Sequence, residues 1–183
     1  MKGIDHKRLG LQIAAQFPAN ITFLERKIFV AGCVLPDRNM FTYLRGCIRS
    51  RKIRGHHYQN VKKIVKKDME RLSNKTKWKK GDYYHLGKLL HYVTDAFTFP
   101  HNEEFRGNLK EHVEYEKKFH FLLEENVCLL GGRQPVWVKQ KNGTEFFECF
   151  EREHTRYLKM RESMWDDLKY IYQMASLVFD LVI

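Results

Sequence analysis

Residues of the types that bind metal ions are concentrated in one short stretch of the chain: His91, Asp95, His101, His112 and Glu116. The first two lie four residues apart, as do the last two, and side chains at this spacing share one face of a helix. Pro100 separates the two pairs and predicts a helix break directly before His101. Imidazole nitrogens and carboxylate oxygens are ligands that zinc takes in proteins. The stretch therefore predicts a zinc site between two facing helices.

Each of these pairs, taken alone, has an ordinary alternative explanation. A histidine four residues from an acid is most often a solvated pair on a helix surface, which binds no ligand. The presence of two such pairs, with a Pro-His corner between them, favours the metal site over this alternative.

The spacing of this stretch, H-x3-D-x5-H-x10-H-x3-E, and its segment LHYVTDAFTFPHN resemble the central ligand run of the zinc-dependent phospholipase C family. That family shares a superfamily with zinc nucleases that prefer single strands. The resemblance covers residues 6–116 and implies an all-α fold, in which a multi-helix bundle holds a zinc cluster between its helices. A chain of 183 residues has the length of a single domain. We therefore expect one zinc-dependent phospholipase C-like domain over residues 1–183.

The resemblance implies two ligands at the start of the chain. His6 would by itself be interpreted as an exposed histidine, but it matches an early histidine of the family's third zinc site. In the family, the amino group and carbonyl of the first residue, normally a tryptophan, complete that site. Met1 stands there in this sequence, and its backbone amine and carbonyl are the expected ligands.

Two further ligands are implied between the start of the chain and the central stretch. Asp37 ends a G-x3-P-D pattern, which alone indicates an ordinary turn carboxylate. In the family this aspartate binds zinc and is a candidate general base. His56 and His57 are adjacent and poorly placed to bind one metal together. The aromatic Tyr58 that follows them favours His56 as the ligand by the family's pattern, with His57 as the alternative.

The resemblance distributes the ligands over two or three zinc ions per chain. The expected sets are Asp37, His56 and His91 for one zinc; His101, His112 and Glu116 for a second; and His6, Met1 and a bridging Asp95 for a third. Clustered zinc activates water and neutralises charge on phosphate. The expected activity is therefore zinc-dependent hydrolysis of a phosphate ester, most directly a phospholipid head-group bond. Asp37 is the expected catalytic residue, which orients or deprotonates the water.

The charge of the chain suits an anionic substrate. It has 33 Lys and Arg against 22 Asp and Glu, which gives a formal net charge of +11. In the basic stretch RGCIRSRKIRGHHY, Arg49 and Arg54 are candidates for binding a phosphate oxygen. The surplus fits a phospholipid or other phosphate ester, an anionic membrane surface or nucleic acid, and does not by itself separate them. No protein partner is implied.

Two other functions remain open from the sequence. A zinc nuclease of the same superfamily would use the same cluster, together with aromatic side chains for base stacking and a basic groove. Trp137 and the positive charge permit this function. The other is a non-catalytic metal-binding protein that acts at lipid or nucleic acid surfaces.

Cysteine usage and the N-terminal sequence bear on the location of the protein. The four cysteines show no C-x2-C spacing, so no disulfide framework is implied. The N-terminus lacks the pattern of a signal peptide, and no apolar window reaches the length of a transmembrane helix. We expect a cytoplasmic protein.

Helical periodicity predicts the elements that position these residues. The expected helices span residues 5–17, 23–32, 58–73, 82–97, 109–126, 145–161 and 164–182. Asp5 and Asp82 are the expected caps of the first and fourth helices. Residues 127–144 break the pattern, with a short extended segment predicted at 136–138. The last helix is expected to form core, and His154 in the preceding helix is expected to have no functional role.

Overall fold

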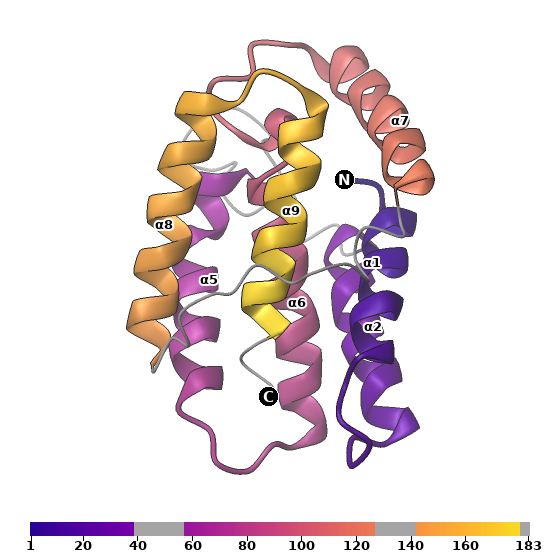
Figure 1. The fold of residues 1–183 in the computed structure, drawn as a ribbon, viewed down its shortest axis with the longest axis vertical. Helices are drawn as coiled ribbons and strands as arrows, with labels where there is room; N and C mark the ends of the chain where they lie inside the picture. The colour runs from indigo at the N-terminus through magenta and orange to yellow at the C-terminus, as the bar shows by residue number, and fades with distance from the viewer. Residues whose placement is uncertain (39–56, 127–141, 180–183) are drawn as a thin grey trace.

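The computed structural model describes residues 1–38, 57–126 and 142–179, which form α-helices and one 3-10 turn (Figure 1). The elements are α1 (Gly3–Ala15), α2 (Phe23–Arg38), α5 (Tyr58–Ser73), α6 (Lys80–Ala96), η1 (Phe99–His101), α7 (Leu109–Glu125), α8 (Gly143–Met160) and α9 (Met164–Phe179). No β-strand occurs within these ranges, so the predicted all-α fold is confirmed. The extended segment predicted at 136–138 lies outside the described residues.

Helix α6 is the centre of the bundle. It packs against α2, α5 and α9, while α8 packs on α5 and α9, and α1 packs on α2 (Figure 1). Its second half is buried on every side, and this half includes the polar residues His91 and Asp95. Because buried polar groups must find polar partners, these two side chains have to face polar atoms of the neighbouring elements.

Two glycines let α2 and α6 approach closely. A Cβ atom on Gly87 would lie 2.0 Å from the carbonyl oxygen of Phe29, and one on Gly32 would lie 2.3 Å from the carbonyl oxygen of Tyr84. Both contacts would be made with helix backbone, which cannot move aside as a flexible side chain can. Any larger residue at either position would therefore push the helices apart. The close approach places the end of α2 beside the second half of α6.

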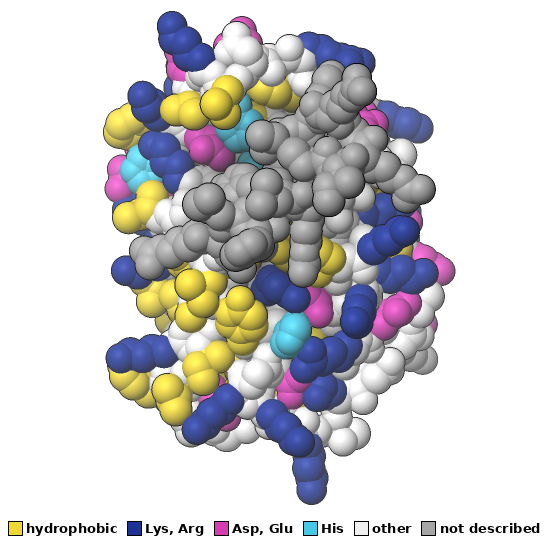
Figure 2. Space-filling view, turned by 180° about the vertical axis from the view of Figure 1, so that it is seen from behind, with side chains coloured by type: hydrophobic (Ala, Val, Ile, Leu, Met, Phe, Trp, Pro, Cys, Tyr) yellow, Lys and Arg dark blue, Asp and Glu magenta, His cyan; other side chains and the backbone are white. Residues whose placement is uncertain are grey.

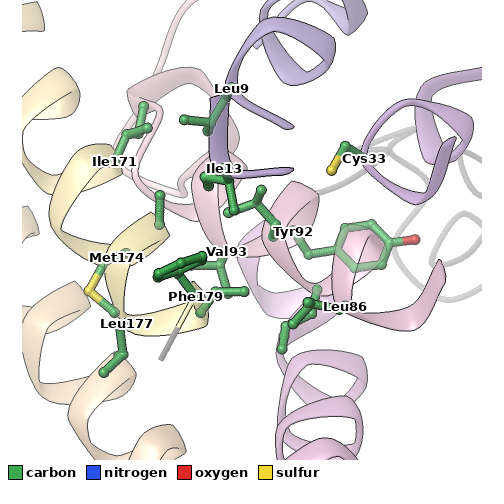
Figure 3. Packing of buried hydrophobic residues seen from close by; sticks show 14 of the residues in the cluster. Leu9, Ile13, Cys33, Leu86, Tyr92, Val93, Ile171, Met174, Leu177 and Phe179 are labelled. Atoms are coloured by element: carbon green, nitrogen blue, oxygen red, sulfur yellow. The ribbon is translucent and has the colours of Figure 1, made fainter. Parts of the chain in front are cut away.

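A continuous apolar core joins α1, α2, α6 and α9. Figure 3 shows part of it, where side chains of these helices pack together: Leu9, Ile13, Cys33, Leu86, Tyr92, Val93, Ile171, Met174, Leu177 and Phe179. Each fully buried leucine or isoleucine contributes roughly 1.5–3 kcal/mol relative to an exposed one. The helix α9 is thus part of the core, as its apolar spacing predicts.

The bounds of α1 and α2 differ from the predicted ones in ways that change the interpretation of Asp5 and Pro36. Helix α1 begins at Gly3, so Asp5 is not its N-cap but a buried residue inside the first turn, where it contacts His120. Helix α2 does not end at residue 32 but continues through Pro36 to Arg38. The proline lies in the last turn, where only two residues follow it, so the backbone hydrogen bond that its missing N–H cannot make is lost only at the end of the helix. Asp37 therefore lies in the last turn of α2 and not in the loop turn that the Pro-Asp pair alone indicates.

The start of α6 shows that Asp82 caps the helix from inside the first turn. The helix begins at Lys80, and Asp82 accepts a hydrogen bond of 2.8 Å from the backbone N–H of Lys79. A carboxylate in this place also interacts favourably with the helix dipole.

No helix among the described ranges is both long and apolar enough to cross a membrane.

Candidate metal centre

The described candidate ligands come from α1, α2, α6, η1 and α7 and form two adjacent clusters. The first cluster contains His6, Asp37, His91 and Asp95, and the second contains His101, His112 and Glu116. Within each cluster, one nitrogen or oxygen atom of every residue lies within 4.8 Å of those of the others. Elements far apart in the sequence thus bring together the residues that the sequence pattern selects.

The first cluster is buried against α6. His6 Nε2 lies 3.0 Å from Asp95 Oδ1, and His91 Nε2 lies 3.3 Å from Asp95 Oδ2 and 3.5 Å from Asp37 Oδ1. The rings of His6 and His91 stack with their centroids 3.9 Å apart. Asp37 is the most accessible member, with 18% of its side chain exposed, whereas the other three are at most 1% exposed. Asp37 is therefore the member that solvent can reach.

The second cluster lies between the η1 turn and α7. His112 Nε2 is 3.3 Å from Glu116 Oε1, and His101 Nε2 is 3.7 Å from the same oxygen. The other ring nitrogen of His101, Nδ1, is 3.8 Å from Asp95 Oδ2, which connects the two clusters. Burial lowers the pKa of His101 to about 4. Its ring is therefore neutral at pH 7, which is the state that binds a metal ion.

The amino group of Met1 lies between the two clusters. Its nitrogen is 2.9 Å from Asp95 Oδ1, 3.2 Å from His101 Nε2 and 3.3 Å from Glu116 Oε1. Burial alone would lower the pKa of this amino group, but Asp95 and Glu116 raise it to about 11. Burial likewise opposes ionisation of Asp95, yet His101, the Met1 amine and the other nearby histidines hold its pKa well below the usual range. The carboxyl groups of Asp95 and Glu116 are thus placed to interact with positive charge.

The hydrogen bonds of the two buried histidines orient them for metal binding. His91 Nδ1 is 2.9 Å from the carbonyl oxygen of Cys33, which can only accept, so this nitrogen carries a proton and Nε2 faces the carboxylates. Thr94 donates its hydroxyl to the carbonyl oxygen of Leu90, so its oxygen can accept from His6 Nδ1 at 3.4 Å. Such partners on the far ring nitrogen are typical of metal-binding histidines.

The residues of both clusters fit a zinc ion. In a tetrahedral site with bonds of about 2.0–2.1 Å, neighbouring ligand atoms lie roughly 3.3 Å apart. The histidine–carboxylate distances of 3.0–3.5 Å in the first cluster and 3.3–3.7 Å in the second are close to this spacing, and the other donor pairs of each cluster lie within 4.8 Å. Nitrogen and carboxylate oxygen are also the donor types that zinc takes.

Some of the predicted site residues lie outside these clusters. His56, Arg49 and Arg54 fall outside the described residues. His57, the alternative to His56, is buried directly before α5 and belongs to neither cluster.

The structure also connects the centre to α8 and α9, in which the sequence analysis named no site residue. His154 Nε2 lies 2.8 Å from Oδ1 of Asn102, the residue after His101, and the Asn102 amide donates to the carbonyl oxygens of Ala96 and Thr98. A second connection runs from Asp167, which accepts a hydrogen bond of 3.1 Å from the backbone N–H of Phe99. The sequence carried one usable signal, since Asp167 lies four residues before Ile171 on the apolar face of its helix.

Comparison with known proteins places the chain in a family. A family model described as zinc dependent phospholipase C matches residues 5–166, a range that includes every described member of both clusters. No curated protein and no solved structure matches the chain. Because the matched range covers most of the sequence, the chain belongs to the zinc dependent phospholipase C family.

Proposed function

We propose that this protein is a phospholipase C-like phosphodiesterase that hydrolyses a phospholipid head-group bond in a zinc-dependent reaction. The observation that carries the proposal is the pair of donor clusters, connected through Asp95 and the Met1 amine, in a chain of this family. Two metal ions a few ångströms apart suit phosphate esters, because together they contact both the attacking and the leaving oxygen.

Each cluster would hold one zinc ion, and a third, held by His6, a deprotonated Met1 amine and a bridging Asp95, would share His6 and Asp95 with the first cluster. When bound, zinc supplies the Lewis acidity that activates water and offsets phosphate charge. His6 and His91 are held by Thr94 and Cys33, so their Nε2 atoms need no reorganisation before they bind a metal ion. The first cluster is therefore pre-organised by the fold.

Asp37 is the proposed general base. It belongs to the first cluster, and its carboxylate is also partly exposed, so it can contact both the centre and an incoming water molecule. A general base must lie within hydrogen-bond reach of the proton that it removes. The end of α2 holds Asp37 in this place because Gly32 and Gly87 bring α2 against α6.

The surface beside the second cluster favours a lipid over a nucleic acid. On α7, three of the four positions of one exposed row are apolar, with Leu109 79%, Val113 42% and Phe121 62% exposed, and Lys117 occupies the fourth. This row neighbours the row that contains His112 and Glu116, because residues three apart adjoin on a helix. A nucleic-acid groove would instead present basic and stacking aromatic side chains. In Figure 2, hydrophobic side chains lie next to histidine and acidic side chains, with lysine and arginine side chains around them.

The test compares hydrolysis of phosphatidylcholine vesicles with cleavage of single-stranded DNA by the zinc-loaded protein. We expect release of the phosphorylated head group, loss of this activity in His91→Ala, and no DNA cleavage. Cleavage of DNA without lipid hydrolysis would identify a nuclease. Zinc binding with neither activity would identify a non-catalytic metal-binding protein, and both results would overturn the proposal.

A further inference from the structure

Asp167 is a buried carboxylate that accepts hydrogen bonds from four residues. It lies in the first turn of α9, directly beyond the range matched by the family model, and its exposed fraction is 0%. Its Oδ2 atom accepts from the backbone N–H of Phe99 and from the hydroxyl of Tyr115. Its Oδ1 atom accepts from the hydroxyl of Tyr157 at 2.9 Å and from Nε of Arg161 at 2.8 Å.

Two of these donors belong to the elements that carry the second cluster. Phe99 is the first residue of the η1 turn, which ends at His101. Tyr115 precedes Glu116 on α7 and lies three residues after His112. One carboxylate oxygen therefore connects the backbone of the turn to the helix that faces it.

Arg161 closes this arrangement into a ring of contacts. Its Nη2 atom donates to the Tyr115 hydroxyl at 3.0 Å, and its guanidinium lies 4.0 Å from the centre of the Phe99 ring. The arginine thus contacts the same two anchor residues as Asp167, and it also balances the negative charge of the buried carboxylate.

The half of α7 that carries the donors has one apolar contact with the core, the half-buried ring of Tyr115. The buried residues of this helix are Phe119 and Leu123, and both follow the cluster residues His112 and Glu116. The Tyr115 hydroxyl is the polar contact that joins the first half of α7 to α9. The spacing between His101 and the two α7 donors therefore depends on the contacts of Asp167.

We propose that Asp167 is a positioning residue for the second metal site, which it acts on by fixing the η1 turn and α7 relative to each other. The inference rests on the proposed metal binding. It predicts that changes at Asp167 alter the metal affinity of the second cluster and leave that of the first cluster unchanged.

The experiment measures zinc affinity by competition with a chromophoric chelator. Zinc sites of different affinity form separate classes in such a titration, and the class that His112→Ala removes belongs to the second cluster. Asp167→Asn keeps the size of the side chain but replaces one acceptor oxygen with an N–H donor. We expect it to weaken this class about 10- to 100-fold. Tyr115→Phe should weaken the same class. Tyr157→Phe is the matched control. It also removes a hydroxyl that donates to the Asp167 carboxylate, but Tyr157 lies on α8, which carries no residue of either cluster.

Three results would overturn the inference. The first is unchanged zinc affinity in folded Asp167→Asn and Tyr115→Phe, and the second is equal weakening of both classes of sites. The third is a loss of affinity in Tyr157→Phe as large as that in Tyr115→Phe. In the His112→Ala background, Asp167→Asn should cause no further loss. Circular dichroism and thermal melting of the zinc-free variants separate site-specific loss from unfolding. A wild-type protein that binds no zinc would overturn the proposed function itself, whereas normal wild-type binding with unaffected variants overturns this inference alone.

Discussion

The two donor clusters are held by different physical means. The first cluster lies in the apolar core, where α2 and α6 meet backbone to backbone at Gly32 and Gly87. The second cluster is more open, with His112 27% and Glu116 18% exposed. Its half of α7 has no buried apolar residue and depends on polar contacts with α9.

This difference indicates different roles for the two sides of the centre. Close-packed cores resist displacement, so the first cluster keeps one geometry whether or not a ligand is bound. The ion pairs within the second cluster are partly open to solvent, so they stabilise less and allow adjustment. We therefore expect substrate to approach from the side of Asp37, His112 and Glu116, and the buried histidines to serve as the fixed part of the centre.

The largest effect should come from breaking the contact between α2 and α6. Gly87→Ala places a methyl group 2.0 Å from the carbonyl oxygen of Phe29, so we expect a loss of about 3 kcal/mol in unfolding free energy. Gly81→Ala is the control, because its Cβ meets nothing within 4 Å. That change should be neutral or stabilise by up to about 1 kcal/mol, since alanine favours the helix. Denaturant unfolding measures both, and equal stability of the two variants would contradict the packing account.

An intermediate effect should come from His154, which contacts Asn102 directly after the η1 turn. Burial lowers the pKa of His154 to about 4 from an ordinary value of 6.5. Between these values the unfolded chain binds more protons, so stability is present above pH 6.5 and is lost as the pH falls toward 4. Protonation of His154 should therefore lower the free energy of unfolding by about 2 kcal/mol between pH 7 and pH 5.

The variant His154→Phe checks this contribution in metal-free protein. The phenyl ring can keep the stacking on Tyr58, whose ring centroid lies 3.6 Å from that of His154, but it does not titrate. Its stability should therefore fall by about 2 kcal/mol less than that of the wild type between pH 7 and pH 5. Parallel pH profiles in denaturant unfolding would show that His154 is not the group responsible.

The smallest effect should appear on the exposed side of α7. Phe121→Ser removes an exposed aromatic ring from the row beside the second cluster, and we expect about fivefold slower hydrolysis of phosphatidylcholine vesicles. Hydrolysis of a monomeric short-chain phosphatidylcholine should not change, because the ring contacts the lipid surface and not the reacting ester.

Phe23→Ser is the matched control for this surface effect. Phe23 is 72% exposed, but it begins α2, and Asp37 lies near the other end of that helix, roughly 20 Å away. We expect this variant to hydrolyse both substrates at the wild-type rate. An equal loss on vesicles in both variants would mean that the α7 row has no special role.

The parts of the centre that could be predicted from the sequence are those encoded by local spacing. Side chains four residues apart on a helix necessarily share a face, so His91 with Asp95 and His112 with Glu116 were identifiable as pairs. The family resemblance implied the all-α class, and helical periodicity predicted the individual helices. Pro36 was misleading, because a proline signals a helix break but is tolerated near the end of α2.

The contacts made by α8 and α9 could not be predicted in the same way. Asp167 and Phe99 lie 68 residues apart in the sequence, and no local pattern determines which distant donor a buried carboxylate meets. His154 and Asn102 are separated by 52 residues and present the same difficulty. Sequence periodicity predicted the helices that carry Asp167 and His154, and tertiary packing determines the partners of these two residues.

The metal content of the protein tests the central claim most directly. Elemental analysis of untagged protein purified without chelators should find two or three zinc ions per chain. His91→Ala and His112→Ala should each lower this number, since they belong to different clusters. A folded wild-type protein that contains no zinc, even after zinc is added, would contradict the account.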